Sequence, residues 1–342
     1  METIADFGTV SHFGVQTLAT GIYTTWFTLG DRVASAQLAL GLLAIALLLF
    51  GLERIRSRGE LALAQDANRS RWPRMHLRGA RAVAAFTACA LPVLLGAVVP
   101  VVMLVSLGRG SEQNWLSDRY IGFFTNSLIL AGFAAIITLT AAILLSTNRR
   151  MGQSGRSKAA VEIARMGYAV PGGVIAIGLF VPVAGFDIAL DAWTRANMGF
   201  STGLLFSGSI ALLILAYMIR FLAAALGAWR AGEVTLTRDL DRAAFGLGAN
   251  TMTVLRRIHI PVLRPAALTA MLLVFVDTIK ELPATLIIRP FGWDTLAVQA
   301  YRLAADERLE GAAVPSLVIV AIGLVPVISL CRRMNTGPRS PR

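Results

Sequence analysis

Three ionisable residues stand close together inside an apolar stretch of the sequence: Asp277, Lys280 and Glu281. An unpaired charge at the centre of a bilayer is unfavourable by about 2.5–3.5 kcal/mol on insertion scales, so each of these residues needs a partner or a wet cavity. Asp277 and Lys280 are three residues apart and can pair on one helix face. Two interpretations stay open. The residues form a paired cluster that reaches the external face of the bilayer, or they form the polar lining of a translocation path. Pro283 favours the second, because it breaks a helix locally and frees carbonyl groups.

A second pair of acids, near the start of the chain, matches this cluster. The segment METIADF (1–7) aligns with VDTIKEL (276–282), so that Glu2 and Asp6 meet acidic residues. The match continues downstream, where Thr17-Leu18-Ala19 meets Thr295-Leu296-Ala297 and Tyr23 meets Tyr301. Duplicated halves are common in transporters, whose substrate site lies at the interface between repeats. Glu2 and Asp6 are therefore further candidates for lining a path.

Other kinds of site chemistry find little support in the sequence. The three histidines lie far apart, and the two cysteines have no C-x-x-C spacing. No phosphate-binding loop of the form G-x-x-x-x-G-K-[ST] occurs. We therefore expect this chain to have no catalytic residue and no metal site, and to bind no cofactor. The chain is not predicted to be an enzyme.

The composition indicates a polytopic, all-α membrane protein. The chain has 342 residues, of which 56% are hydrophobic and 15% charged, whereas charged residues make up about 25% of a soluble domain. A helix needs about 20 apolar residues to cross a bilayer. Continuous runs near that length predict spanning helices rather than alternating barrel strands. They lie at about 34–52, 83–107, 126–147, 167–188, 204–226, 265–288 and 314–331.

The positive charges indicate which connections face the cytoplasm. Most of the 32 Lys and Arg residues lie in 53–82, 148–166, 227–264 and the tail after 331, which are therefore predicted to be cytoplasmic. The same distribution argues against nucleic-acid binding, because the net charge of +12 is spread over these connections and forms no basic patch. The long basic stretch 53–82 is expected to be a solvated linker.

The most informative of these connections is the third. A short helix is predicted over 236–247, where apolar residues recur at spacings of three and four. Gly248 would end this helix, and a second could run to about Ile258. Pro261 and Pro265 suit the first turn of the next membrane helix.

This connection resembles the cytoplasmic signature E-A-A-x3-G-x9-I-x-L-P of the permeases of binding-protein-dependent ABC importers. The spacing from Ala243 and Ala244 to Gly248, and then to Ile258 and Pro261, fits throughout. Two positions differ, since Arg242 replaces the family's Glu and Ile260 its Leu. The resemblance implies a coupling loop (229–264) that docks on a separate ABC ATPase dimer, which would hold ATP and Mg. The residues implied in docking are Leu240, Asp241, Arg242, Ala243, Ala244, Gly248, Ile258 and Pro261.

Two further segments, GYAVPGGVIAIGL (167–179) and the stretch 276–317, resemble the iron(III)-transport branch of these permeases, in which two six-helix halves are fused. The N-terminal METIADFGTVSHFGVQTLATGIY is similar to the end of a first half. The resemblance implies an all-α MetI-like bundle with Met1 internal to the family's fused chain. The expected division is a remnant of the first half (1–52), a cytoplasmic linker (53–82), a complete second half with six spanning helices (83–331) and a cytoplasmic tail (332–342).

The function that this resemblance implies is that of an ABC importer permease in a bacterial inner membrane. Its substrate would arrive on a periplasmic binding protein, with ferric iron the first candidate and thiamine, phosphonate or polyamine substrates as alternatives. A separate first permease half or a second copy would be a further partner, within membrane lipid. A secondary transporter would also show duplicated halves but would not explain the coupling loop. An inactive fragment stays open as the third interpretation.

Overall fold

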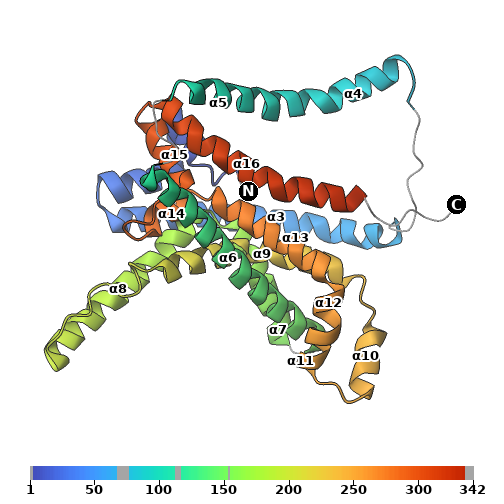
Figure 1. The fold of residues 1–342 in the computed structure, drawn as a ribbon. Helices are drawn as coiled ribbons and strands as arrows, with labels where there is room; N and C mark the ends of the chain where they lie inside the picture. The colour runs from blue at the N-terminus through green and yellow to red at the C-terminus, as the bar shows by residue number, and fades with distance from the viewer. Residues whose placement is uncertain (1–2, 68–76, 112–116, 153–154, 336–342) are drawn as a thin grey trace.

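The computed structural model describes residues 3–67, 77–111, 117–152 and 155–335, which form helices joined by turns (Figure 1). Glu2 and the tail from 336 lie outside the described residues. Six described helices have the length and hydropathy to cross a membrane, and a bent pair of helices makes a seventh if it counts as one span. The six are Arg32–Glu53, Ala80–Arg109, Asp118–Met151, Gly172–Met198, Ile210–Glu233 and Leu309–Ile328.

The long elements overlap the predicted apolar runs, but several extend well beyond them. They are α3 (Arg32–Ala67), α4 (Ala80–Val93), η2 (Leu94–Val98), α5 (Val99–Arg109), α6 (Asp118–Met151), α8 (Gly172–Met198), α9 (Ile210–Glu233), α13 (Arg264–Ile279) and α16 (Leu309–Asn335). The short elements are α1 (Gly8–His12), α2 (Leu18–Tyr23), η1 (Thr24–Thr28), α7 (Gly155–Met166), η3 (Gly167–Ala169), α10 (Arg238–Gly246), α11 (Thr251–Val254), η4 (Leu255–His259), α12 (Ile260–Val262), α14 (Pro283–Ile288) and α15 (Leu296–Ala305).

The centre of the bundle is formed by α6, α9 and α13, which pack against one another. Small residues allow these helices to approach one another closely, as is usual between membrane helices. Gly232 of α9 lies at one such close approach, since a Cβ atom on it would lie 2.5 Å from the Cβ of Ala266 on α13. Around this contact, Trp229, Leu236 and Leu263 form a separate buried cluster.

Two elements differ in detail from the apolar runs, and the first difference is the helix break that Pro283 predicts. The run 265–288 is not one helix: α13 ends at Ile279 and α14 begins at Pro283, because a proline suits a helix's first turn but not its interior. The expected linker 53–82 is helical as far as Ala67, since α3 continues beyond its apolar part.

The aligned segments of the two ends share local structure. Thr17 and Thr295 both have an extended backbone, and each side chain accepts a hydrogen bond from the backbone N–H three residues on. Each threonine thus caps a short helix, α2 or α15, by the same device. Each short helix then packs on the long helix that follows it, α2 on α3 and α15 on α16.

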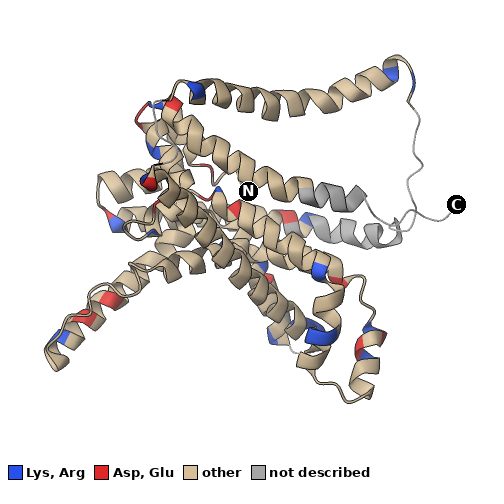
Figure 2. Ribbon diagram, viewed as in Figure 1, with Lys and Arg blue, Asp and Glu red and all other residues tan. Residues whose placement is uncertain are grey.

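The α4–η2–α5 span lies at the edge of the bundle (Figure 1). Its α5 part packs on α16, while no residue of its most apolar window is buried. Figure 2 shows that charged residues gather at helix ends and in the connections, leaving the middles of the spans largely uncharged. Six or seven candidate spans of this composition make the chain a multi-pass membrane protein.

Candidate translocation path and coupling loop

A buried ion pair lies at the break between α13 and α14. The Arg220 Nε atom stands 3.3 Å from a Glu281 carboxylate oxygen, and the two side chains are 15% and 5% exposed. Arg220 lies within α9 rather than at its end. Arg220 is therefore neutralised in place by Glu281 rather than by the membrane interface.

Glycine makes room for this pair at the start of α8. A Cβ atom on Gly172 would lie 2.3 Å from an Arg220 guanidinium nitrogen and 2.4 Å from Glu281 Oε1. Contacts that short do not occur, so any larger residue at this position would displace the pair. The glycine pair in GYAVPGGVIAIGL thus has a packing reason, which the sequence alone did not reveal.

The broken backbone beside the pair is hydrogen-bonded within the protein. The Ala284 N–H donates to Glu281 Oε1 at 3.2 Å, and the Thr285 hydroxyl donates to the Glu281 carbonyl oxygen at 2.6 Å. The Tyr217 hydroxyl is 2.6 Å from that of Thr285. The break between α13 and α14 leaves backbone N–H and C=O groups without helical partners. Side chains of Glu281 and Thr285 supply these partners, so these groups need no water inside the membrane.

The other predicted path residues lie around the same break. Asp277 and Lys280 form the predicted i,i+3 pair, at 3.0 Å. Asp6 is half-buried and accepts a hydrogen bond from the Thr9 N–H at 3.2 Å. Asp6, Lys280, Glu281 and Pro283 line one cavity of about 490 Å³, which we call the lysine cavity. The two aligned segments therefore meet at a shared cavity, whereas Glu2 lies outside the described residues.

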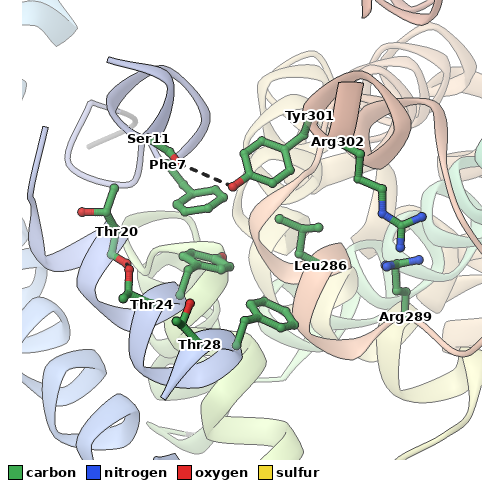
Figure 3. Close-up of a pocket in the computed structure, with 11 residues that line it drawn as sticks. Phe7, Ser11, Thr20, Thr24, Thr28, Leu286, Arg289, Tyr301 and Arg302 are labelled. Atoms are coloured by element: carbon green, nitrogen blue, oxygen red, sulfur yellow. Dashed lines mark hydrogen bonds between the residues drawn. The ribbon is translucent and has the colours of Figure 1, made fainter. Parts of the chain in front are cut away.

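A second cavity, of about 380 Å³, lies between α1, α2, η1 and the α14–α15 region, and we call it the tyrosine cavity (Figure 3). Its lining is mainly aromatic rings, hydroxyl groups and two arginines. The residues are Phe7, Ser11, Thr20, Tyr23, Thr24, Phe27, Thr28, Leu286, Arg289, Tyr301 and Arg302. Tyr23 and Tyr301, which the sequence alignment pairs, therefore both face this cavity.

Phe7 belongs to the lining of both cavities. Its ring is 4% exposed and lies with its centroid 3.8 Å from that of Tyr23 and 5.2 Å from that of Tyr301. Three aromatic rings therefore stand where the tyrosine cavity and the lysine cavity adjoin. No sequence signal singled out Phe7, because a phenylalanine in an apolar segment is unremarkable by itself.

The predicted coupling loop contains the expected helix, break and second helix. Helix α10 (Arg238–Gly246) lies within the predicted range, and Gly248 has a φ of 82° that favours glycine. Its surface-facing residues are Leu240, Arg242, Ala243, Gly248 and Pro261, whereas Ala244 and Ile258 are half-buried. Large apolar residues are exposed there too, with Phe245 at 41% and Leu247 at 89%.

Asp241 faces into the protein and not outward with these residues. It is 7% exposed, and its carboxylate accepts hydrogen bonds from Arg150 Nε at 2.6 Å and His259 Nε2 at 2.8 Å. Burial opposes ionisation, but the bonds from His259 and Arg150 outweigh it and hold the pKa of Asp241 below its ordinary value. Asp241 therefore anchors α10 to the end of α6 and to η4 instead of presenting a free charge.

The loop is joined to the path through a sharp bend. The helical segment Thr251–Val262 meets α13 at an angle of 79°, with the buried Leu263 at the corner. Pro261 lies before this bend, and Pro265 starts α13 as predicted. At its other end α13 carries Asp277 and leads to the Arg220–Glu281 pair. One rigid helix therefore connects α10's anchor to the cavities.

Several residues that contact the predicted candidates were not singled out by the sequence. Arg150, His259 and Gly172 each act through a contact with a residue distant in sequence, which spacing cannot reveal. Arg289 and Arg302 share Asp294, which lies between them in the sequence, but no predicted motif included them. Within the part of the chain that the structure describes, no group of three or more His, Cys, Asp or Glu residues could hold a metal ion.

Known proteins with similar sequences are transport permeases. The chain is 27% identical over 339 residues to the Fe(3+)-transport system permease protein FbpB 2 of Haemophilus influenzae, covering 96% of this chain and 63% of that protein. It therefore spans less than two thirds of that relative's length. A stretch of 136 residues is 29% identical to PhnV of Salmonella typhimurium, named for a 2-aminoethylphosphonate transport system, covering 40% of this chain and 51% of that protein. No protein-family model matches the chain.

The fold has a counterpart among solved structures. A chain in the crystal structure of a bacterial alginate ABC transporter, in complex with an alginate pentasaccharide-bound periplasmic protein, superposes with a TM-score of 0.56. The match covers 75% of this chain and 96% of that one at 15% sequence identity, and so concerns the fold alone. The chain is thus a homologue of iron(III)- and phosphonate-type permease proteins, with the all-helical fold of an ABC transporter permease.

Proposed function

We propose that this chain is a permease of a binding-protein-dependent ABC importer in a bacterial inner membrane. The observation that carries the proposal is α10, an exposed helix with apolar side chains at its surface, fixed to α6 and η4 by Asp241 and joined to α13 by a bend. Such a helix can pass a partner's movement to the membrane helices. The ATPase would hold ATP and Mg, and this chain no cofactor.

Exposed Ala243, Phe245 and Leu247 suit a protein partner. Apolar and aromatic side chains are typical of interface centres, and small residues allow close backbone approach. The secondary-transporter alternative gives α10 no role, since an ion-driven transporter needs no cytoplasmic ATPase.

The division of the chain is part of the same proposal. We assign residues 1–52 to the end of a first permease half, 53–82 to the connection between halves and 83–331 to a second half. The shared caps of Thr17 and Thr295 support this assignment. A first half or a second copy of the chain would complete the path. The tail 332–342 would then be cytoplasmic, with the coupling loop.

The substrate would be delivered by a periplasmic binding protein. Ferric iron is the first candidate, because the relative that matches nearly the whole chain is named for Fe(3+) transport. A phosphonate is the second, from the relative that matches the shorter stretch.

Docking is tested by co-purifying the permease with an ABC ATPase, identified by its P-loop sequence. Ala243→Glu and Gly248→Trp should each reduce ATPase recovery by tenfold or more, because they place a charge or a bulky ring in the docking surface. Ala305→Glu introduces the same side chain at an exposed position on α15, away from α10 (Figure 1), and should leave recovery unchanged. Unchanged recovery with both loop variants would refute the coupling-loop assignment.

A further inference from the structure

The tyrosine cavity is positively charged, although the path residues suggested by the sequence are mainly acidic. Arg289 and Arg302 are the charged residues in its described lining, and no carboxylate joins them there. Both arginines pair with Asp294, the Arg302 contact measuring 2.5 Å. Two guanidinium groups share one carboxylate, which leaves one net positive charge. The two arginines lie side by side at one end of the cavity (Figure 3).

That charge persists at neutral pH. Burial, helped by the neighbouring Arg302, lowers the pKa of Arg289 to about 10, which still leaves its guanidinium protonated at pH 7. Arg302 is more exposed, at 43% of its side chain, and faces the cavity beside it. An entering ion would therefore meet a positive field in a site partly withdrawn from water, where electrostatic interactions are less screened.

The cavity wall also holds donors that are not fully satisfied. The Tyr301 hydroxyl, which lines the cavity, makes only a long contact of 3.5 Å with that of Ser11. Arg289 Nε and the Tyr23 hydroxyl are buried within the wall and have no hydrogen-bond partner among the residues described, the Tyr23 hydroxyl lying close to Gly173. Buried donors are normally satisfied, so the wall has unused capacity to bind an oxygen-bearing ligand.

The acids near the break offer little to a cation. Glu281 is paired with Arg220 and Asp277 with Lys280, and neither acid lines the tyrosine cavity. Asp6 lines the lysine cavity and not the tyrosine cavity. A bare metal ion in the tyrosine cavity would thus meet no carboxylate in the described lining, and would be repelled by the arginine pair.

We infer that the tyrosine cavity binds a small oxyanion, held by the arginines and by the Tyr301 hydroxyl. That this anion is the transported substrate rests on the proposed function. The chemistry fits two sources: a phosphonate-like molecule, or iron(III) within an anionic chelate. In either case the permease would accept an anion and not a free cation.

The field in the cavity can be measured with charged thiol reagents on the detergent-solubilised protein, whose two faces are then both accessible. Cys89 and Cys331 are replaced by serine, and Thr28→Cys places a thiol in the cavity lining. The reaction rates of an anionic (sulfonatoethyl) and a cationic (trimethylammonioethyl) methanethiosulfonate are each divided by the rate with free 2-mercaptoethanol. The resulting anion-to-cation ratio should be several-fold higher than at Thr235→Cys, an exposed control in the turn after α9.

Neutralising one arginine should lower this ratio. Arg302→Gln is expected to reduce it several-fold at Thr28→Cys, whereas Arg195→Gln, which neutralises an exposed arginine on α8, should leave it unchanged. A ratio at Thr28→Cys that favours the cationic reagent, or that ignores Arg302→Gln, would overturn the inference. If either of these results were obtained while the permease still co-purified with the ATPase, the oxyanion site would be refuted but the proposed permease function would not.

The ligand source is distinguished by protection of the same thiol. Methylphosphonate or citrate-chelated iron(III), whichever resembles the substrate, should slow labelling of Thr28→Cys, and Arg302→Gln should abolish the protection. Protection by Mg²⁺ alone, or by none of the three, would contradict an oxyanion site. If the permease did not co-purify with an ABC ATPase but the ligand still protected the thiol, the oxyanion site would stand and its role in ATP-driven transport would be refuted.

Discussion

At the scale of single residues, the charges beside the α13–α14 break are matched in pairs. Arg220 on α9 meets Glu281 after α13, and Asp277 meets Lys280 within a turn. A buried pair is weak evidence for stability in itself, but removing one partner leaves an uncompensated charge. The Arg220–Glu281 pair thus fixes how α9 and the α13–α14 turn sit together.

The effect of this pairing can be measured by a double-mutant cycle. Arg220→Met should lower the unfolding free energy by about 3–5 kcal/mol, because Glu281 would then be buried without its partner. The double variant Arg220→Met with Glu281→Leu should recover most of this loss, since two apolar residues need no partner. Thermal unfolding in detergent provides the comparison.

Arg195→Met is the matched control, because Arg195 is exposed and its pair with Asp191 is expected to contribute little to stability. If the double variant were as unstable as Arg220→Met, the pair would not be the source of the loss.

Gly172 makes a second prediction at this scale. Gly172→Ala should destabilise the protein and separate Arg220 from Glu281, because the new methyl group would overlap both side chains. Gly178→Ala, on the same helix, has no atom within 4 Å of the added Cβ. That control should be neutral or stabilising by about 0.5–1 kcal/mol, since alanine is the better helix former. Equal melting temperatures for the two variants would show that the space at Gly172 is not tight.

At the scale of elements, α10 depends on one carboxylate for its position. Asp241 joins it to Arg150 at the end of α6 and to His259 in η4. Arg150 also donates to the carbonyl oxygens of Leu236 and Thr237, which lie just before α10. A single acid and a single arginine therefore connect three elements at this end of the bundle.

Hydrogen exchange along α10 tests this anchor. Because the pKa of Asp241 is lower in the folded protein, its stabilisation is full above the ordinary aspartate value of 3.8 and is lost as the pH falls through the lower folded value. Protection of α10, corrected for intrinsic exchange, should thus be equal at pH 7 and pH 5 and decline below pH 3.8. Asp241→Asn should reduce it at pH 7 by about 1–3 kcal/mol.

Asp239→Asn is the matched control on the same helix, since Asp239 is 85% exposed and pairs only with its helix neighbour Arg242 in the contacts described. Its effect on α10 protection should be small. A larger effect from Asp239→Asn than from Asp241→Asn would show that the anchor is elsewhere.

At the scale of the whole molecule, the sequence predicted the apolar spans, the α10–Gly248 break and the Asp277–Lys280 pair. Those features follow from local composition and spacing, which determine helices and their ends. It did not predict the inward orientation of Asp241 or the positive tyrosine cavity. Each of these depends on which helices meet: Arg150 and Asp241, for example, are brought together only when α6 and α10 are neighbours.

Phe7 gives this arrangement a mechanical consequence. One ring forms part of the wall of two adjoining cavities, so a displacement that enlarges one must narrow the other. Phe7 belongs to the segment that aligns with the α13–α14 turn, so the repeated part of the sequence supplies the partition between the two cavities.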